Sequence, residues 1–583
     1  MMSLRIEKRS TFARLKSARS AWSGRLNRFG RDEDGSMILF GLFLLILMLM
    51  ASGLAIDTMR AEYTRTTIQN TLDRAVLAAA DLNQTEDARS VVIDYFDKAG
   101  MAQYLNADSI VVTHSTAAGQ LSFRRVSATA STEVDTLFMS MLGVDRIVSG
   151  GASTAEEGIT DLEISLVVDV SGSMGWSSSS GSTKIYELRE AAKDFSYYMQ
   201  CNPNAERNSN EPCTVEDGKV SISLVPYAEQ VTVGSTLLDK LNVSNEHQSS
   251  DCVTFSGAEF DTTALDPQVE LSRTGHFDPW NSANYYPSSW TCRTDSWRKV
   301  KPFMEDHNDV FAAINQLSAG GNTSIDLGMK WGAALLDPTL RPAIQTLTTE
   351  DSGNGTPVVD PAFAGRPYDY TQEYSMKVVV LMTDGVNTDQ HYLKDQYRSG
   401  LSEVYRNTDP NYSNHFSIYN PSTEKYYYTH DGTWNDFPFG DADGEVVTVT
   451  NTSCTWTWWR GYRCTTTTEE QVINQPGAAV QMNYQAVWER FPTDWYAQWS
   501  WLQDPVAANG TSTKNARLQD ICSAAKQQGV IVYTIGFEVS GDADNVMSQC
   551  ASTPGHYFPA NGSNLAEIFG VIASSINQLR LTQ

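Results

Sequence analysis

The segment from Ser36 to Ile56 carries no charged side chain, and it constrains this chain more than any other feature. In a helix that rises about 1.5 Å per residue, roughly twenty apolar residues cross a bilayer core of about 30 Å. We therefore predict a transmembrane helix at 36–56. A cleaved signal peptide is the alternative, but the apolar run is longer than a typical signal core and a helical pattern continues to Leu82.

The charge on either side of this run predicts its orientation. Residues 1–35 hold nine Lys and Arg side chains and four acidic ones. Because a basic flank stays in the cytoplasm, we predict a single-pass protein of the inner membrane with its main part periplasmic or extracellular. The whole chain has a formal charge of -26, which argues against a nucleic-acid partner. Cleavage near Gly30 or Gly35 stays open.

All eight cysteines follow the apolar run, which suits an oxidising compartment. Zinc binding is the competing interpretation, but no C-x-x-C pair occurs and the histidines are scattered. Eight cysteines allow many pairings, and a preference for short loops favours four pairs of neighbours. These pairs are Cys201–Cys213, Cys252–Cys292, Cys454–Cys464 and Cys522–Cys550.

Five segments are expected along the chain. They are a basic segment 1–35, the transmembrane helix 36–56, an amphipathic stalk helix 57–85, a small α/β module 86–160 and a larger α/β domain 161–583. Met59, Tyr63, Ile68, Leu72, Val76 and Leu77 recur at helical spacing and predict the stalk. Short β-rich runs and a helix at Thr136–Leu142 are expected in the small module.

From Asp161 onward, strands alternate with helices, which is typical of a mostly parallel sheet with helical crossovers. The expected strands are Leu162–Val170, Val220–Pro226, Lys377–Met382 and Val530–Phe537. The expected helices are Ile185–Met199, Asp309–Leu317, Ser324–Leu336, Lys514–Gln528 and Leu565–Leu579.

Two polar, aromatic-rich insertions, 231–301 and 388–508, interrupt this alternation. The second contains a predicted hairpin between Cys454 and Cys464. Its tryptophans, Trp456, Trp458 and Trp459, are expected in cross-strand packing rather than as a binding platform.

Oxygen-bearing side chains stand at the ends of two predicted strands and at the start of one helix. DVSGSM places Asp169, Ser171 and Ser173 after the first strand. TDG places Asp384 after a later strand, and GGNTS places Thr323 before a helix. Because the carboxyl ends of parallel strands share one edge, we expect these five side chains to converge. Such an oxygen shell suits Mg²⁺, with Mn²⁺ or Ca²⁺ as substitutes, and leaves the ion able to take a partner's carboxylate.

This pattern resembles the metal-ion-dependent adhesion site of von Willebrand factor A (vWA) domains. All five positions match: Asp-x-Ser-x-Ser, a Thr before a helix and an Asp after a later strand. The resemblance implies a Rossmann-like vWA fold, with a central mostly parallel sheet and large insertions. It also implies metal binding by all five residues, with Asp384 acting through water.

The N-terminal end carries a second resemblance. RDEDGSM before the apolar run, and AIDTMRAEYTRTTIQNTLDRAVLAAA at its end, look like the TadE/TadG-like proteins of bacterial Tad (Flp) pilus assembly. The two resemblances imply an anchored vWA protein that binds a divalent cation and captures an acidic side chain of a protein partner. That partner would be a pilus component or a surface ligand, in pilus assembly or adhesion.

Two other classes of function stay open. A structural envelope or stalk protein would use the metal only for stability, and the sequence does not separate it from an adhesive protein. A haloacid-dehalogenase-like phosphatase needs a second Asp two residues after the first, where this chain has Ser171. No G-x-S-x-G motif surrounds Ser173 either, so we expect no enzyme activity.

Overall fold

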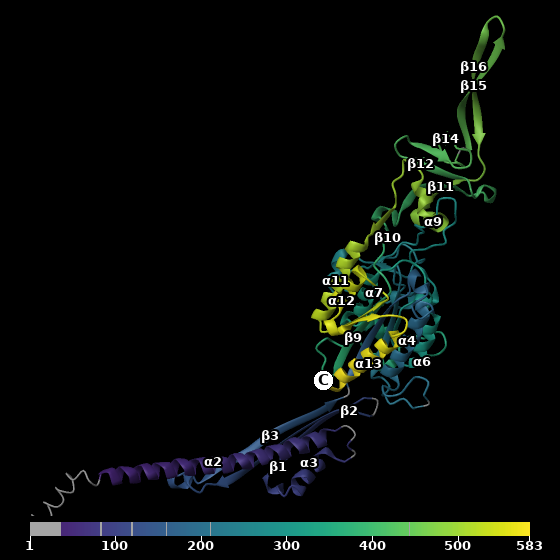
Figure 1. Ribbon diagram of the computed structural model, residues 1–583. Coiled ribbons are helices and arrows are strands. Elements are labelled where there is room, and N and C mark those ends of the chain that lie inside the picture. The colour runs from purple at the N-terminus through teal and green to yellow at the C-terminus, as the bar shows by residue number, and fades with distance from the viewer. Residues whose placement is uncertain are drawn as a thin grey trace, which may run out of the picture. The chain divides into compact units, whose positions relative to one another are not determined.

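The computed structural model describes residues 36–81, 84, 86–117, 120–158, 160–209, 211–441 and 443–582. The basic segment 1–35, with both cleavage positions, lies outside them. The chain divides into two compact units, Met1–Ile159 and Thr160–Gln583 (Figure 1).

The first unit begins with one continuous helix, α2 (Ser36–Ala80). Its first part exposes its apolar side chains, and by length and composition the helix could cross a membrane, which suggests a membrane anchor. Further along, Ile68, Leu72 and Val76 are fully buried. Met59, Tyr63 and Leu77, expected on the same face of the stalk, are instead exposed, because they lie outside the stripe that the rest of the unit covers.

A helix and an antiparallel sheet cover the buried face of α2. The helix is α3 (Ala88–Lys98), and the strands, in spatial order, are β1 (Leu105–Ala117), β2 (Gln120–Asp135) and β3 (Arg146–Gly158). Alternate residues of β2, Val126, Ala128 and Ala130, join the core. The helix expected at Thr136–Leu142 is only a 3-10 turn, η3 (Met139–Leu142), which ends at Gly143 with a φ of 86°.

A six-stranded sheet forms the centre of the second unit. Its spatial order is β20 (Tyr557–Ala560), β19 (Ile531–Phe537), β9 (Ser375–Thr383), β4 (Asp161–Asp169), β5 (Val220–Tyr227) and β8 (Lys301–Met304). All neighbouring pairs are parallel except β5 and β8. This is the order of a doubly wound fold, and it confirms the predicted Rossmann-like sheet.

Helices cover both faces of this sheet, as the buried strands require. The side chains of β4 alternate between two cores, with Leu166 and Val168 in one and Val167 in the other. The first core is closed by α4 (Lys184–Gln200), α6 (His307–Gln316) and α13 (Leu565–Thr582). The second is closed by α7 (Ile325–Ala334), α8 (Arg341–Leu347), α11 (Thr511–Gln527) and α12 (Asp542–Cys550).

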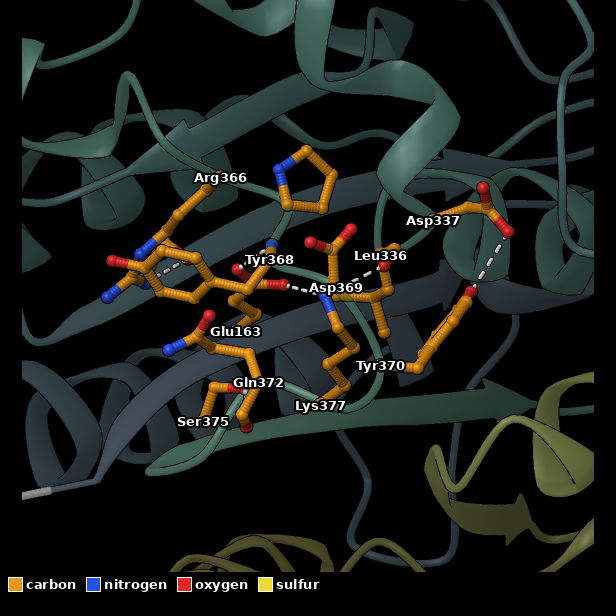
Figure 2. A network of polar contacts seen from close by, with 12 residues as sticks. Glu163, Leu336, Asp337, Arg366, Tyr368, Asp369, Tyr370, Gln372, Ser375 and Lys377 are labelled. Atoms are coloured by element: carbon orange, nitrogen blue, oxygen red, sulfur yellow. Dashed lines mark hydrogen bonds and ion pairs between the residues drawn. The ribbon is translucent and has the colours of Figure 1, made fainter.

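Buried charged side chains link two neighbouring strands of this sheet near their amino ends (Figure 2). Glu163 of β4 pairs with Lys377 of β9, and its carboxylate also accepts a hydrogen bond of 2.8 Å from the Tyr368 backbone N–H. The Arg366 guanidinium donates to the Leu162 carbonyl at 2.8 Å. Because each buried charge has a partner, the network fixes the segment before β9 instead of destabilising it.

The second insertion folds as a subdomain with its own core. Strands β10 (Gln390–Leu393) and β18 (Val506–Asn509) pair at its base. Beyond them lies an antiparallel sheet of β14 (Trp434–Asn435), β13 (Lys425–Tyr428), β12 (Phe416–Asn420), β11 (Leu401–Asn407) and β17 (Ala479–Asn483). Val404, Ile418, Trp488 and Tyr496 are among its buried residues. In the first insertion, β6 (Val253–Thr254) and β7 (Ser272–Arg273) pair.

All four predicted disulfides are present. Cys454 and Cys464 face each other across the hairpin of β15 (Asp443–Thr457) and β16 (Gly461–Asn474), which projects from the second insertion (Figure 1). Trp456 pairs across this hairpin with Tyr462, as predicted. For Trp458 and Trp459 the prediction is wrong: they lie in the turn beyond the last strand pair, stacked on each other and 80% and 77% exposed.

Candidate metal centre

Asp169 is the last residue of the central strand β4 and is fully buried. Its two carboxylate oxygens are held separately: the Ser171 backbone N–H donates to Oδ1 at 2.8 Å, and the Thr383 hydroxyl donates to Oδ2 at 2.8 Å. Thr383 is the last residue of the neighbouring strand β9. Parallel pairing of β4 and β9 therefore orients this carboxylate at the carboxyl edge of the sheet.

Hydrogen bonds between side chains link three more of the expected residues. The hydroxyl oxygens of Ser171 and Ser173 are 3.1 Å apart, and the Ser173 hydroxyl donates to Asp384 Oδ1 at 2.7 Å. Asp384 follows β9 directly. The structure thus joins Asp169, Ser171, Ser173 and Asp384 in one hydrogen-bonded group, with Asp169 linked through the Ser171 backbone N–H.

Thr323 reaches this edge on a neighbouring loop. The Gly172 backbone N–H donates to the Gly321 carbonyl at 2.9 Å, and a β-carbon on Gly172 would meet that same oxygen at 3.4 Å. The backbone hydrogen bond therefore ties the two loops together. Thr323 is 5% exposed, and within the described part of the chain no hydrogen bond joins its hydroxyl to the other four residues.

The charges of the centre favour a cation. Burial, and then the neighbouring Asp384 carboxylate, raise the pKa of Asp169 to about 7. The Lys184 ammonium, at the start of α4, donates to Asp384 Oδ2 at 3.1 Å. This ammonium pairs with only one of the two buried carboxylates, so a divalent cation can balance the charge of the other, and the oxygen-only donor set fits a hard ion such as Mg²⁺.

Three residues of the centre were not identified from the sequence. Thr383 adjoins Asp384 in the TDG motif, so its place after a strand was a usable signal. Lys184 and Lys514 belong to no motif and come from helices. Lys514 of α11 is fully buried, and its ammonium donates to the Thr323 carbonyl at 2.7 Å and to the Ser324 hydroxyl at 2.6 Å. Burial lowers the pKa of Lys514, whose charge these oxygens stabilise.

A second cluster of metal-ligating residue types is explained without a metal. Cys201, Cys213 and His307 lie close together, but both sulfur atoms belong to one disulfide. A disulfide sulfur is not the thiolate that zinc binds.

Comparison with known families finds one match. Residues 35–82 match a family model described as putative Flp pilus-assembly TadE/G-like. The match covers α2 and confirms the resemblance of the N-terminal end to that family. It includes neither the sheet nor the metal centre. No curated protein matches the sequence.

Solved structures with similarity include two pilus proteins. One is the vWF domain of the type V pili tip protein Mfa5 from Porphyromonas gingivalis, with 15% identity, a TM-score of 0.28, and 72% of this chain and 96% of that chain covered. Another is the PilB minor pilin from Streptococcus sanguinis, with 12% identity, a TM-score of 0.28, and 81% and 78% covered.

A third similar structure is proximal thread matrix protein 1 from the mussel byssus, with a zinc-occupied MIDAS motif. Its identity is 9% and its TM-score 0.23, and 71% of this chain and 46% of that chain are covered. At TM-scores this low, none of the three similarities carries an argument about function.

Proposed function

We propose that this chain is an anchored, exported vWA-type protein of Tad (Flp) pilus assembly or surface adhesion. In this proposal it binds a divalent cation at the carboxyl edge of its sheet and captures an acidic side chain of a protein partner. The observation that carries the proposal is the convergence of Asp169, Ser171, Ser173 and Asp384 from two strand ends. The family match at residues 35–82 supports the pilus context.

In this proposal each side chain has a defined part in holding the ion. Asp169 supplies a carboxylate, and Ser171 and Ser173 supply hydroxyl oxygens. Thr323 supplies a further hydroxyl from the adjacent loop. Asp384 contacts the ion through water and accepts a hydrogen bond of 2.7 Å from the Ser173 hydroxyl. When bound, the ion would supply positive charge with an open coordination position for a partner's carboxylate. Mg²⁺ suits this shell best, with Mn²⁺ or Ca²⁺ as substitutes.

The second insertion, 388–508, is proposed to form the rim of the partner surface, and its base lies next to the proposed metal site. Its residue Thr388 accepts a hydrogen bond of 2.8 Å from the Thr323 backbone N–H and donates its own N–H to the Thr323 carbonyl at 3.1 Å. The Asn322 amide donates to the Asp389 carbonyl at 2.9 Å. The insertion is therefore tied directly to the loop that carries one proposed ligand. The β15–β16 hairpin, whose turn carries Trp458 and Trp459, projects beyond the subdomain sheet (Figure 1).

Orientation in the membrane is part of the same proposal. The basic segment 1–35 stays cytoplasmic, 36–56 spans the inner membrane, and the disulfide-bonded unit is exported. The four disulfides support this because they persist in oxidising compartments.

Two other functions have less support than metal-dependent partner capture. A stalk protein that uses the metal only for stability would share this geometry but would not need a metal-dependent partner. A phosphatase of the haloacid-dehalogenase type would need an acid where Ser171 stands, and Ser171 is instead hydrogen-bonded within the cluster. We propose a non-enzymatic role.

A pull-down from envelope extract tests the proposal. The full chain in nanodiscs is mixed with extract in Mg²⁺, in chelator, and as the Asp169→Ala variant in Mg²⁺. We expect partner capture in the first condition only. Equal capture in all three would exclude a metal-dependent adhesive function, whereas metal binding without any capture would favour the stalk alternative.

A further inference from the structure

The turn between β2 and β3 in the first unit is uncharged and apolar. Residues 136–144 read TLFMSMLGV, without a single acidic or basic side chain. Five of its six large apolar side chains are exposed, and none of the six belongs to the core of the unit. The exposed ones are Leu137, Phe138, Met141, Leu142 and Val144, of which Met141 is 79% exposed. An exposed apolar cluster of this kind marks a surface that another apolar phase covers.

This turn is fixed to α2 at the end of the apolar run. A β-carbon on Gly53 would collide with the Phe138 ring, so the ring lies directly on the helix backbone there. One turn later, the buried Asp57 carboxylate accepts backbone hydrogen bonds from Leu137 at 2.9 Å, Phe138 at 2.7 Å and Met139 at 2.8 Å. These contacts fix the height of the turn along the helix.

The level at which the turn meets α2 lies within the apolar run that is expected to cross the bilayer. Gly53 precedes Asp57, the first charged residue after the apolar run, by four positions, which is about 6 Å of helical rise. Side chains at this level reach the boundary between headgroups and acyl chains, where interfacial elements bury their apolar faces by roughly 5–10 Å.

We propose that residues 136–144 form a membrane shoulder, a turn whose apolar side chains insert into the outer leaflet of the bilayer that α2 spans. This inference rests on the proposed anchor. The occupant is lipid because the turn touches the segment that the bilayer surrounds, and lipid needs no complementary shape.

The charges around the shoulder fit the headgroup level. Arg146, just after the turn, bridges Glu133 at 2.7 Å and Asp135 at 3.1 Å. Arg60, one turn beyond Asp57, donates to the Asp135 carbonyl at 3.4 Å. The polar groups thus begin where the apolar turn ends, as at an interface. The shoulder would hold the first unit at a fixed height and limit the tilt of α2.

Site-specific fluorescence in proteoliposomes tests the shoulder. All eight cysteines are in disulfides, so one introduced cysteine is a unique labelling site in the full chain. An environment-sensitive dye is attached at Met141→Cys, at Leu45→Cys in the apolar run, or at Tyr63→Cys. Tyr63 is the matched control, since it is 76% exposed on α2 but lies roughly 10 Å past Ile56. The vesicles contain phosphatidylethanolamine and phosphatidylglycerol, with nitroxide lipids of two depths.

We expect the Met141 dye to show blue-shifted emission, strong quenching by the shallow nitroxide and loss of iodide quenching, while the Tyr63 dye shows the opposite. A Met141 dye that behaves like the Tyr63 dye would overturn the shoulder. Protection from both iodide and nitroxides would also overturn it, because protein and not lipid would then cover the turn. The Leu45 dye reports on the anchor: if the deep nitroxide does not quench it, the anchor fails and the shoulder with it.

Discussion

At the residue scale, the two carboxylate oxygens of Asp384 have different partners, one neutral and one charged. One oxygen accepts a hydrogen bond from Ser173 and the other pairs with the Lys184 ammonium, whose side chain is 9% exposed. In the proposed metal site, this ammonium repels the arriving cation and at the same time stabilises the metal-free centre. Lys184 would therefore set the affinity of the site without being a ligand.

Replacing Lys184 with Met tests this role. We expect Lys184→Met to bind Mg²⁺ about five- to tenfold more tightly, because a repulsive charge is removed. In chelator the variant should unfold at a lower temperature, since Asp384 loses its partner, and Mg²⁺ should restore the loss. Calorimetry and thermal unfolding measure the two effects. Lys184→Arg, which keeps the charge, is the control, and weaker Mg²⁺ binding by the Met variant would contradict this account.

Glu305 provides a pH-dependent contribution to stability. Burial, and then the Asp360 carboxylate, raise its pKa from 4.5 to about 7. The folded state binds this proton more tightly than the unfolded state, so the associated stability is full below about pH 4.5 and is lost as pH rises through 7. We expect Glu305→Gln to raise the unfolding temperature by roughly 1–2 °C at pH 8 and to leave it unchanged near pH 4.5. The exposed control Glu373→Gln should change nothing. An equal shift at both pH values would refute the assignment.

The residues that could be predicted at the metal centre share one property. Asp169, Ser171, Ser173 and Asp384 belong to short motifs at strand ends, where topology alone brings them together. Lys184 and Lys514 could not be found in this way, because their contacts depend on how α4 and α11 pack against the sheet. Helix packing brings them to the centre from positions distant in the sequence.

At the element scale, the second insertion offers a separable surface. Thr388 and the β10–β18 pair hold its base, whereas most of its sheet and its core lie beyond them. Replacing residues 395–504 with a short Gly/Ser turn should therefore preserve Mg²⁺ binding and abolish partner capture in the pull-down. Replacing only 444–473 removes the hairpin and is the matched control, for which we expect both properties to persist. If the chain that lacks residues 395–504 still captures the partner at the wild-type level, the insertion does not form part of the partner surface.

The strands of the central sheet could be predicted from the sequence, whereas those of the second insertion could not, and the difference lies in how their side chains are buried. β4, β9 and β19 are buried on both faces, so their apolar runs stand out in the sequence. The insertion builds its core from tryptophan and tyrosine between polar residues, a pattern that did not predict its strands. Trp458 and Trp459 were misplaced because the strand pairing ends at Thr457 and Gly461, so both rings lie in the turn, where no opposite strand residue remains to pack against.

At the scale of the whole molecule, the proposed topology places the two ends of the chain on opposite sides of the membrane. The charge asymmetry around α2 is the physical reason. A reporter fused after Gln583 should be active as alkaline phosphatase, which needs export, and inactive as a fluorescent protein that folds only in the cytoplasm. Removing the nine basic side chains of residues 1–35 should weaken this preference. Activity of the cytoplasmic reporter alone would contradict the topology.

The central claim is that the oxygen cluster at the end of β4 binds a divalent cation. Calorimetric titration of Mg²⁺ into the full chain in nanodiscs tests it most directly, with Asp169→Ala and the exposed control Asp239→Ala beside it. We expect one site in the wild-type chain and in the control. Asp169→Ala should show none while keeping its fold by circular dichroism, because it removes a carboxylate whose burial is itself costly. Unchanged Mg²⁺ affinity in Asp169→Ala would show that the cation, if bound, is held elsewhere.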